Sequence, residues 1–425
     1  MKIILKNIAK IRNAVVELNG ITVIAGENNT GKSTVGKALF SVFNSFYNIE
    51  NQIFDERAST IENALDNFFL VYRRRFASPE STEFARFLVE KYSTVSADFE
   101  ELKNDLVEFL FHSAYSTKKD GQNVDAKQID DLFERIVEII NVSNGEILKN
   151  VVSKKLNNEF NEQINNIYHE EAGQINLIIQ DIPAYVTIID NDIKEISEAY
   201  SLKTEVVYID DPFILDDVRP RNVGYRYANY LDHKNHLRRK LYSNNHQYSI
   251  ISEILTNNKL ENIYSKINDV CRGEIITTKR NGLGYKRYDS EKVLNIKSIS
   301  TGLKTFVILK SLLENGALEN NGTIVLDEPE IHLHPQWQLL LAELIVLIQK
   351  EFNMHILLNT HSPYFMKAIE VFSAKYAIAD KCKYYLAQSE GDSSIIFDVT
   401  SSPEEIYRLL ARPLQDLENM RFQDD

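Results

Sequence analysis

Apolar residues recur along the chain at two different spacings, which predict strand-rich and helix-rich segments. Short apolar runs typical of strands lie at 2–5, 14–18, 21–25, 175–179, 186–189 and 206–209. Between the third and fourth runs, residues from about 48 to 172 carry apolar side chains three or four positions apart, which predicts helices with loops at 116–123 and 142–146. From residue 323 onward the pattern alternates between strand and helix, as in an α/β core.

A glycine-rich turn joins the strand at 21–25 to a predicted helix at 32–46. The turn reads Gly26-Glu27-Asn28-Asn29-Thr30-Gly31-Lys32-Ser33 and fits the pattern G-x-x-x-x-G-K-[ST]. In such a loop backbone N–H groups converge on phosphate oxygens, Lys32 neutralises the β- and γ-phosphate charge, and Ser33 offers a hydroxyl to Mg²⁺. Because an apolar strand precedes the turn and a helix comes after it, the sequence predicts a nucleotide-binding loop.

Two later strands end in polar residues suited to hydrolysis. The run 323–326 delivers Asp327 and Glu328 to the carboxyl end of a strand, where ligands bind in open α/β sheets. Asp327 is expected to hold Mg²⁺, directly or through water, and Glu328 to orient or deprotonate the attacking water. The run 355–358 leads to His361, which can contact the γ-phosphate or the attacking water.

A short polar string precedes a further predicted helix at 305–313. Ser300 and Gly302 at its N-terminus can form an anion-binding nest, and ordinary capping by Ser300 or Thr301 is the alternative.

Two histidine pairs invite a metal interpretation that their surroundings do not favour. His332 and His334 stand two apart in a loop beside Pro335, so an interface role is expected. His233 and His236 are three apart on a predicted helix with no visible carboxylate partner, so a solvated helix face is expected.

Composition limits the class of protein. With 425 residues, 44% of them hydrophobic, the chain can form two or three domains with real cores. The longest apolar stretch, 339–348, contains Glu343 and is about half the length of a membrane span, and the N-terminus returns to charge too early for a signal peptide. Cys271 and Cys382 are expected to be buried or idle thiols, which favours a cytoplasmic location.

Charge is unevenly distributed. A net charge of −13 excludes a uniformly basic nucleic-acid coat, yet residues 219–297 hold 16 Lys and Arg against 7 Asp and Glu. The tyrosines interleaved with these charges are Tyr225, Tyr227, Tyr230, Tyr285 and Tyr288. Such a segment can contact nucleic acid, meet an acidic partner or form a solvated helix face, and the sequence leaves these three open.

The four motifs, in this order, resemble those of ABC-type ATPases, in the branch of RecF, SMC and OLD proteins often called AAA-15 ATPases. The turn 26–33 resembles Walker A, with the Asn28 typical of that branch, and Asp327-Glu328 resembles Walker B. His361 in Thr-His-Ser-Pro resembles the switch histidine, and 300–302 resembles the signature motif with isoleucine before it in place of leucine.

Two further positions complete the comparison with that branch. The stretch Glu330 to Pro335 is similar to the segment after Walker B in these proteins, and Gln180 is a candidate for the Q-loop glutamine.

The resemblance implies an α/β fold with a split ABC-type head at 1–47 and 174–425, made of a mixed sheet, flanking helices and a small antiparallel β-lobe. Outside the resemblance, the apolar spacing predicts a helical insertion at 48–173, and the charge pattern predicts a basic, tyrosine-rich subdomain at 219–297. The resemblance also implies ATP and Mg²⁺, with Ser33 and Asp327 at the metal and Lys32, Glu328 and His361 in catalysis. The remaining nucleotide contacts would be Gly26, Glu27, Asn28, Asn29, Thr30, Gly31, Thr34, Ser300 and Gly302.

The resemblance further implies a homodimer or a higher even-numbered oligomer, in which ATP on one chain meets Ser300 and Gly302 of another. OLD-like proteins carry a TOPRIM nuclease domain after the ATPase, whereas 64 residues follow His361 here, so a separate nuclease or toxin partner is expected. The first hypothesis is therefore an ATPase subunit of an antiphage system, similar to the Septu ATPase. A RecF-like repair ATPase that binds DNA and an ATP-gated scaffold with little turnover are the alternatives.

Overall fold

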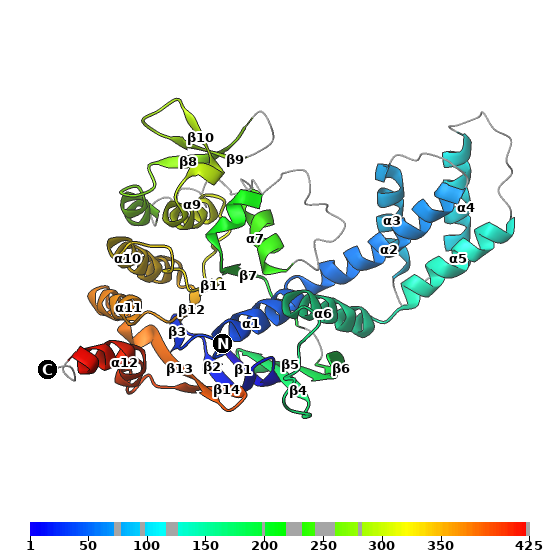
Figure 1. Cartoon of the computed structure of the whole chain (residues 1–425). Helices are drawn as coiled ribbons and strands as arrows, with labels where there is room; N and C mark the ends of the chain where they lie inside the picture. The colour runs from blue at the N-terminus through cyan, green and yellow to red at the C-terminus, as the bar shows by residue number, and fades with distance from the viewer. Residues whose placement is uncertain are drawn as a thin grey trace. The chain divides into compact units, whose positions relative to one another are not determined.

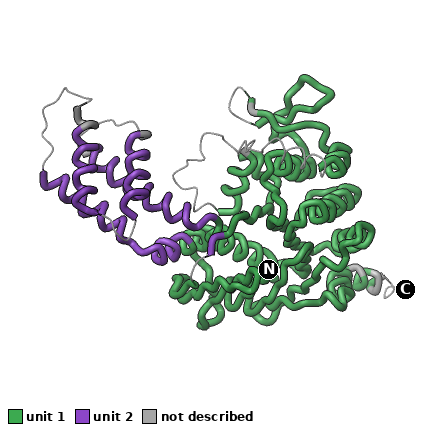
Figure 2. The backbone as a smooth tube through the Cα atoms, turned by 180° about the vertical axis from the view of Figure 1, so that it is seen from behind, with its two compact units in different colours: residues 1–47, 152–198, 202–425 green, residues 48–151, 199–201 purple. Residues whose placement is uncertain are grey.

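The computed structural model describes the chain (Figure 1) except residues 72–77, 94–97, 116–125, 198–199, 218–231, 243–259, 279–282 and 422–425. The chain forms two compact units, one of residues 1–47, 152–198 and 202–425 and one of residues 48–151 and 199–201 (Figure 2). The loop expected at 116–123 and three of the tyrosines, Tyr225, Tyr227 and Tyr230, lie outside the described residues.

An eleven-stranded mixed sheet forms the frame of the first unit. Its strands, in spatial order, are β6 (Asp192–Ile196), β5 (Ile182–Ile189), β4 (Gly173–Ile179), β1 (Lys2–Ile8), β2 (Ile11–Glu17), β14 (Ser393–Asp398), β13 (Cys382–Glu390), β3 (Ile21–Gly26), β12 (His355–Thr360), β11 (Thr323–Asp327) and β7 (Val206–Ile209). The five strands from β13 to β7 are parallel, and those from β6 to β2 form an antiparallel end. The predicted mixed α/β fold is thereby confirmed.

Helices cover both faces of the parallel part of this sheet. On one face Val325 of β11 and Tyr208 of β7 pack against Gly36 of α1 (Lys32–Phe46). The alternate residues of β11, Ile324 and Leu326, join the core formed by α9 (Thr301–Glu314), α10 (Pro335–Phe352) and α11 (Pro363–Lys375), which lie side by side in Figure 1. Side chains of a strand alternate between faces, so burial on both sides explains why these strands are continuous apolar runs.

Smaller elements complete the first unit. Helices α7 (His233–Tyr242) and α12 (Glu404–Arg421) and the short helices η1 (Pro212–Asp217), η3 (Ile296–Ser298) and η4 (Ala379–Lys381) belong to it. A separate three-stranded antiparallel sheet contains β8 (Gly273–Thr277), β9 (Leu283–Arg287) and β10 (Val293–Asn295). The sequence pattern did not predict this small sheet.

The second unit is helical and has its own apolar core. Its helices are α2 (Ile49–Val71), α3 (Ser78–Tyr92), α4 (Phe99–Tyr115) and α5 (Ala126–Asn141). Helix α6 (Asn144–Phe160) is shared between the units: its residues up to Val151 belong to the second unit and those from Val152 onward to the first. The expectation of helix as far as residue 172 is wrong beyond Phe160, because Asn161 and Glu162 adopt positive φ angles of 51° and 63° that end the helix.

In the described part of the chain, no helix is both long enough and apolar enough to span a membrane. Cys271 and Cys382 are buried free thiols.

Candidate nucleotide site

The glycine-rich turn leads from the buried strand β3 directly into α1. Gly31, the N-cap of α1, has φ of 80°, a left-handed conformation that glycine adopts without strain. It has no side chain to cap the helix, so the first N–H groups of α1 are available to an anion. Gly26 is required for another reason, since a Cβ there would lie 2.3 Å from the carbonyl oxygen of Ala387 in β13.

Lys32 is buried beneath this turn. Its Nζ donates to the carbonyl oxygens of Gly26 at 3.0 Å and Glu27 at 2.8 Å, and lies 3.6 Å from Glu328 Oε1. Burial lowers the pKa of Lys32, while the carboxylates of Glu328, Asp327 and Glu330 act in the opposite direction. The lysine is thus held between backbone carbonyls and the acidic end of β11.

Both carboxylate oxygens of Asp327 accept hydrogen bonds from neutral donors. Asn359 Nδ2 donates to Oδ1 at 3.0 Å, and the Tyr208 hydroxyl donates to Oδ2 at 2.7 Å. The same hydroxyl lies 3.5 Å from the backbone carbonyl oxygen of Ser33, so the start of α1 passes close to Asp327. A hydroxyl and a carboxylate with free lone pairs are oxygen ligands of the kind Mg²⁺ prefers, so these residues fit the ion.

Glu328 adopts an unusual backbone conformation at the end of β11. Its φ is 49°, and its N–H donates to the carbonyl oxygen of Asn359 at 2.9 Å. A non-glycine residue in this region carries strain and is worth attention near a site. Its Oε1 lies 3.2 Å from Nδ1 of His361, as well as near Lys32. The structure therefore brings Lys32, Glu328 and His361 together.

Glu330 is a second buried carboxyl beside these groups, and the sequence did not single it out for a role. Its side chain accepts a hydrogen bond from the Thr360 hydroxyl, and Thr360 Oγ1 in turn accepts from the N–H of Ser362 at 3.0 Å. Burial, which leaves the residue 2% exposed, raises the pKa of Glu330 to about 7 against the effect of the Thr360 bond. The only signal was a third acidic residue in Asp-Glu-Pro-Glu.

The residues of the signature-like string have two different local roles. Ser300 is the N-cap of α9, and its side chain accepts from the N–H of Leu303 at 3.4 Å. Gly302 is buried, and a Cβ there would come within 3.1 Å of both the His332 carbonyl oxygen and Trp337. The glycine therefore allows α9 to pack against the segment that comes after β11.

The two histidines of that segment make local contacts. His334 is the N-cap of α10 and accepts from the N–H of Gln336 at 3.4 Å. The ring of His332 meets Phe213 edge-on, with centroids 5.7 Å apart. Within the described residues no group of three or more His, Cys, Asp or Glu side chains is arranged to hold a metal ion.

The expectation of a solvated face for His233 and His236 is wrong, since both are buried. His233 Nδ1 lies 2.5 Å from Glu159 Oε1, and Nε2 lies 2.9 Å from Asp210 Oδ2. Burial lowers the pKa of His233, but the two carboxylates outweigh it and raise the pKa to about 9. These partners are remote in the sequence, on α6 and after β7, so spacing within α7 could not reveal them.

The described part of the basic segment 219–297 is largely paired within the chain. The lysine and arginine ion pairs are Lys234 with Asp210, Arg238 with Asp217, Arg239 and Lys240 with Glu205, Lys266 with Glu343, Lys286 with Glu291, and Arg287 with Asp289. Tyr285 is buried and Tyr288 is exposed, while Lys279 and Arg280 lie outside the described residues. The charge excess of the sequence is thus not a uniform basic surface where it is described.

Gln180 does not lie with the other motif residues. It is exposed in the turn between β4 and β5, with φ of 50°, and four strands separate β4 from β3.

The residues directly after β7, Asp210 and Asp211, lie closer to the motifs and line a cavity of about 40 Å³ with Asp327 and Glu328.

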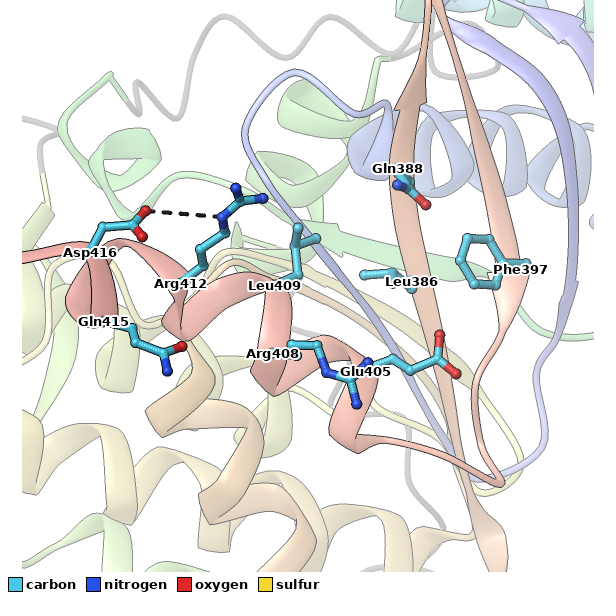
Figure 3. Close-up of a pocket in the computed structure, with 9 residues that line it drawn as sticks. All are labelled: Leu386, Gln388, Phe397, Glu405, Arg408, Leu409, Arg412, Gln415 and Asp416. Atoms are coloured by element: carbon cyan, nitrogen blue, oxygen red, sulfur yellow. Dashed lines mark ion pairs between the residues drawn. The ribbon is translucent and has the colours of Figure 1, made fainter. Parts of the chain in front are cut away.

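A larger cavity of about 490 Å³ lies apart from the motifs, between α12 and the strands β13 and β14 (Figure 3). Leu386, Phe397 and Leu409 supply its apolar lining. Two arginines and two acidic residues line it as well, and Arg412 lies 4.0 Å from Asp416. Its charges therefore balance within the cavity.

Comparison with known proteins identifies relatives of the sequence. The family model described as "AAA ATPase domain" matches residues 1–366. The chain is also similar to the "Retron Vc95 probable ATPase" of Vibrio cholerae serotype O1 biovar El Tor, with 25% identity over 175 residues. That alignment covers 36% of this chain and 33% of the relative, so the chain matches about a third of the relative's length.

The solved structures to which the chain is similar include SMC head domains. The SMC head bound to the C-winged helix domain of ScpA has 12% identity and a TM-score of 0.42, covering 95% of this chain and 98% of that chain. The SMC head domain from Thermotoga maritima has 11% identity and a TM-score of 0.36, covering 94% and 98%.

Proposed function

Because the chain belongs to the AAA ATPase domain family and is an ATPase, we propose that it dimerises around ATP and regulates a separate nuclease or toxin in bacterial antiphage defence. The observation that carries the proposal is the open side of the site. The side chains of Glu328 and His361 remain 26% and 39% exposed, and Ser33 at the start of α1 is exposed. Among the described residues, one side of the expected phosphate site is therefore open.

Each motif residue has a task that its position supports. The N–H groups of the loop 26–34 and Lys32 would bind the phosphates, and Ser33 and Asp327 would hold Mg²⁺, which would neutralise charge on the phosphate oxygens. Glu328 orients the attacking water and accepts its proton. His361, whose Nδ1 lies 3.2 Å from Glu328 Oε1, contacts the γ-phosphate or the attacking water.

A second copy of the chain would complete the site. Three apolar side chains near the motifs are exposed, namely Ile331, Tyr364 and Phe213. Ser300 is exposed at the N-terminus of α9, where N–H groups and the helix dipole favour an anion. ATP held by one chain can then receive donors from α9 of the other, and hydrolysis removes that link.

The oligomeric state in the presence of ATP tests the dimer. Glu328→Gln, which should trap ATP, is expected to convert a monomer into a dimer on adding Mg-ATP, as measured by light scattering after size exclusion. Ser300→Arg in the same background should leave ATP binding intact and abolish the dimer. Ser265→Arg, at another exposed serine, is the matched control. A Ser300→Arg variant that dimerises like the control would contradict the composite site.

The effector is a separate protein in this proposal. The name of the Vibrio cholerae relative ties that ATPase to a retron, which is consistent with a role in a multi-component system. Purification of the Glu328→Gln chain from its native host should recover a nuclease or toxin in stoichiometric amount, and its absence would count against the proposal.

A RecF-like repair ATPase is the second candidate, because residues 219–297 carry an excess of basic charge. Phosphate release with and without linear duplex DNA separates the two. Turnover that rises several-fold with DNA, with a steep salt dependence, would favour repair. An ATP-gated scaffold would instead keep its partner bound when Glu328→Gln removes turnover.

A further inference from the structure

Tyr208 approaches the site from the strand next to β11. It is fully buried in β7 and pairs in register with Val325 of β11. Asp327 is two residues beyond Val325 and therefore on the same face of the sheet. Tyr208 and Asp327 are thus diagonal neighbours on adjacent strands, and the tyrosine hydroxyl lies 2.7 Å from Asp327 Oδ2.

The ring of Tyr208 is held on several sides. A Cβ on Gly36 of α1 would lie 3.2 Å from two atoms of the ring and 2.8 Å from Val325 Cγ1, so glycine at this position lets α1 pack closely on the ring. Phe40 meets the ring edge-on with centroids 6.4 Å apart. His233 stacks on it, with centroids 4.5 Å apart and an interplanar angle of 26°.

The stacked histidine is itself fixed on both ring nitrogens and at its backbone. Glu159 accepts from the N–H of His233 at 3.0 Å and approaches Nδ1, and Asp210 approaches Nε2. The tyrosine hydroxyl therefore has little freedom to move away from Asp327. The carboxylate of an aspartate, by contrast, can adopt a broad range of χ2 angles unless hydrogen bonds hold its oxygens.

We propose that Tyr208 is a positioning residue for ATP hydrolysis, whose hydroxyl fixes the Asp327 carboxylate so that its remaining lone pairs serve Mg²⁺ beside Ser33. The inference rests on the proposed roles of Asp327 and Ser33. The bond from a hydroxyl to a carboxylate is among the stronger hydrogen bonds of proteins. Partners that orient metal ligands typically contribute about 10- to 100-fold to metal affinity or activity. Asn359 holds the other oxygen.

The test measures metal binding separately from turnover. Mn²⁺ binding to the full chain loaded with a non-hydrolysable ATP analogue is followed by electron paramagnetic resonance, and analogue binding is measured without metal. Tyr208→Phe should weaken Mn²⁺ binding about tenfold and leave metal-free analogue binding unchanged. Tyr385→Phe is the matched control, because Tyr385 is also buried and its hydroxyl, which accepts from the N–H of Glu17, likewise bonds a carboxylate, that of Asp398, which is not a motif residue.

Asp327→Asn separates failure of the inference from failure of the site. If Asp327→Asn weakens Mn²⁺ binding and Tyr208→Phe changes it less than twofold, Tyr208 is a structural residue only and the inference is wrong. If neither variant weakens it, the metal role of Asp327 fails and the inference fails with it, while the dimer is tested independently. Should Tyr208→Phe not fold, 3-fluorotyrosine at position 208 strengthens the same donor, and unchanged Mn²⁺ binding would overturn the inference.

Discussion

Replacing Glu330 by glutamine should change how the stability of the ATPase unit depends on pH. Glu330 is buried, accepts from the Thr360 hydroxyl with one oxygen, and has no hydrogen-bond partner for Oε2 among the described residues. Its pKa is raised from 4.5 to about 7, chiefly by burial. The folded chain therefore holds a proton on this carboxyl between these two values, whereas the unfolded chain has lost it.

The sign and size of the effect come from this difference. Because the folded state binds more protons between pH 4.5 and about 7, the free energy of unfolding falls as pH rises through that range. One pKa unit corresponds to about 1.4 kcal/mol. The difference of about 2.5 units between the folded and unfolded chain therefore limits the loss in the free energy of unfolding to about 3 kcal/mol. Glutamine cannot ionise, so Glu330→Gln should lack this fall and become more stable than the parent chain above pH 7.

The single tryptophan, Trp337, makes this measurable. It lies at the start of α10 and packs against Phe306 of α9, so its fluorescence reports on the ATPase unit rather than the helical one. Urea unfolding at pH 5, 6, 7 and 8 without nucleotide gives the difference between variant and parent at each pH. That difference should grow by about 2–3 kcal/mol from pH 5 to pH 8. Parallel pH profiles for the two chains would show that Glu330 does not titrate in this range.

Three further predictions concern stability and can be checked by thermal unfolding. Gly26→Ala should lower the melting temperature by several degrees or prevent folding, because the new Cβ would lie 2.3 Å from the Ala387 carbonyl oxygen. The carboxylates that raise the pKa of His233 to about 9 stabilise the fold fully below pH 6.5, and this stability is lost as pH rises through 9; His233→Gln should not show that loss. Burial raises the pKa of Glu343, but hydrogen bonds from Lys266, Tyr376 and Lys375 outweigh burial and lower the pKa to about 2. These bonds therefore stabilise the fold fully above pH 4.5, and their contribution is lost as pH falls through 2. Glu343→Gln should reduce that acid loss and destabilise the fold by about 1–3 kcal/mol at pH 7.

The sequence predicted well the elements whose residue pattern is typical of only one kind of secondary structure. The strand 206–209 and the helix 32–46 appear with the predicted bounds, because a short apolar run and a phosphate-loop context each define their ends. The small sheet of β8, β9 and β10 was missed. Its strands are only three to five residues long, and Val293, Leu294 and Asn295 of β10 are all exposed, so no alternation marked them.

The residues that hold the motifs in place were harder to predict than the motifs. Lys32, Asp327, Glu328 and His361 stand in local strings whose spacing is typical of phosphate chemistry. Tyr208 stands in an ordinary strand, and only the pairing of β7 with β11 makes it a neighbour of Asp327. Strand order is a property of the whole chain, so no window of sequence contains it.

The register of β11 and β12 explains why a strained residue can persist at this site. Asp327 pairs with Asn359, whose side chain donates to that carboxylate and whose carbonyl oxygen accepts the N–H of Glu328. One asparagine thus fixes the Asp327 carboxylate and the backbone of Glu328 together. The bond to Thr360 then anchors Glu330 on the far side of the turn. Since the left-handed turn at Glu328 is held from both ends, its side chain can remain partly exposed beside Lys32 and still keep one position, as its proposed role of orienting a water molecule requires.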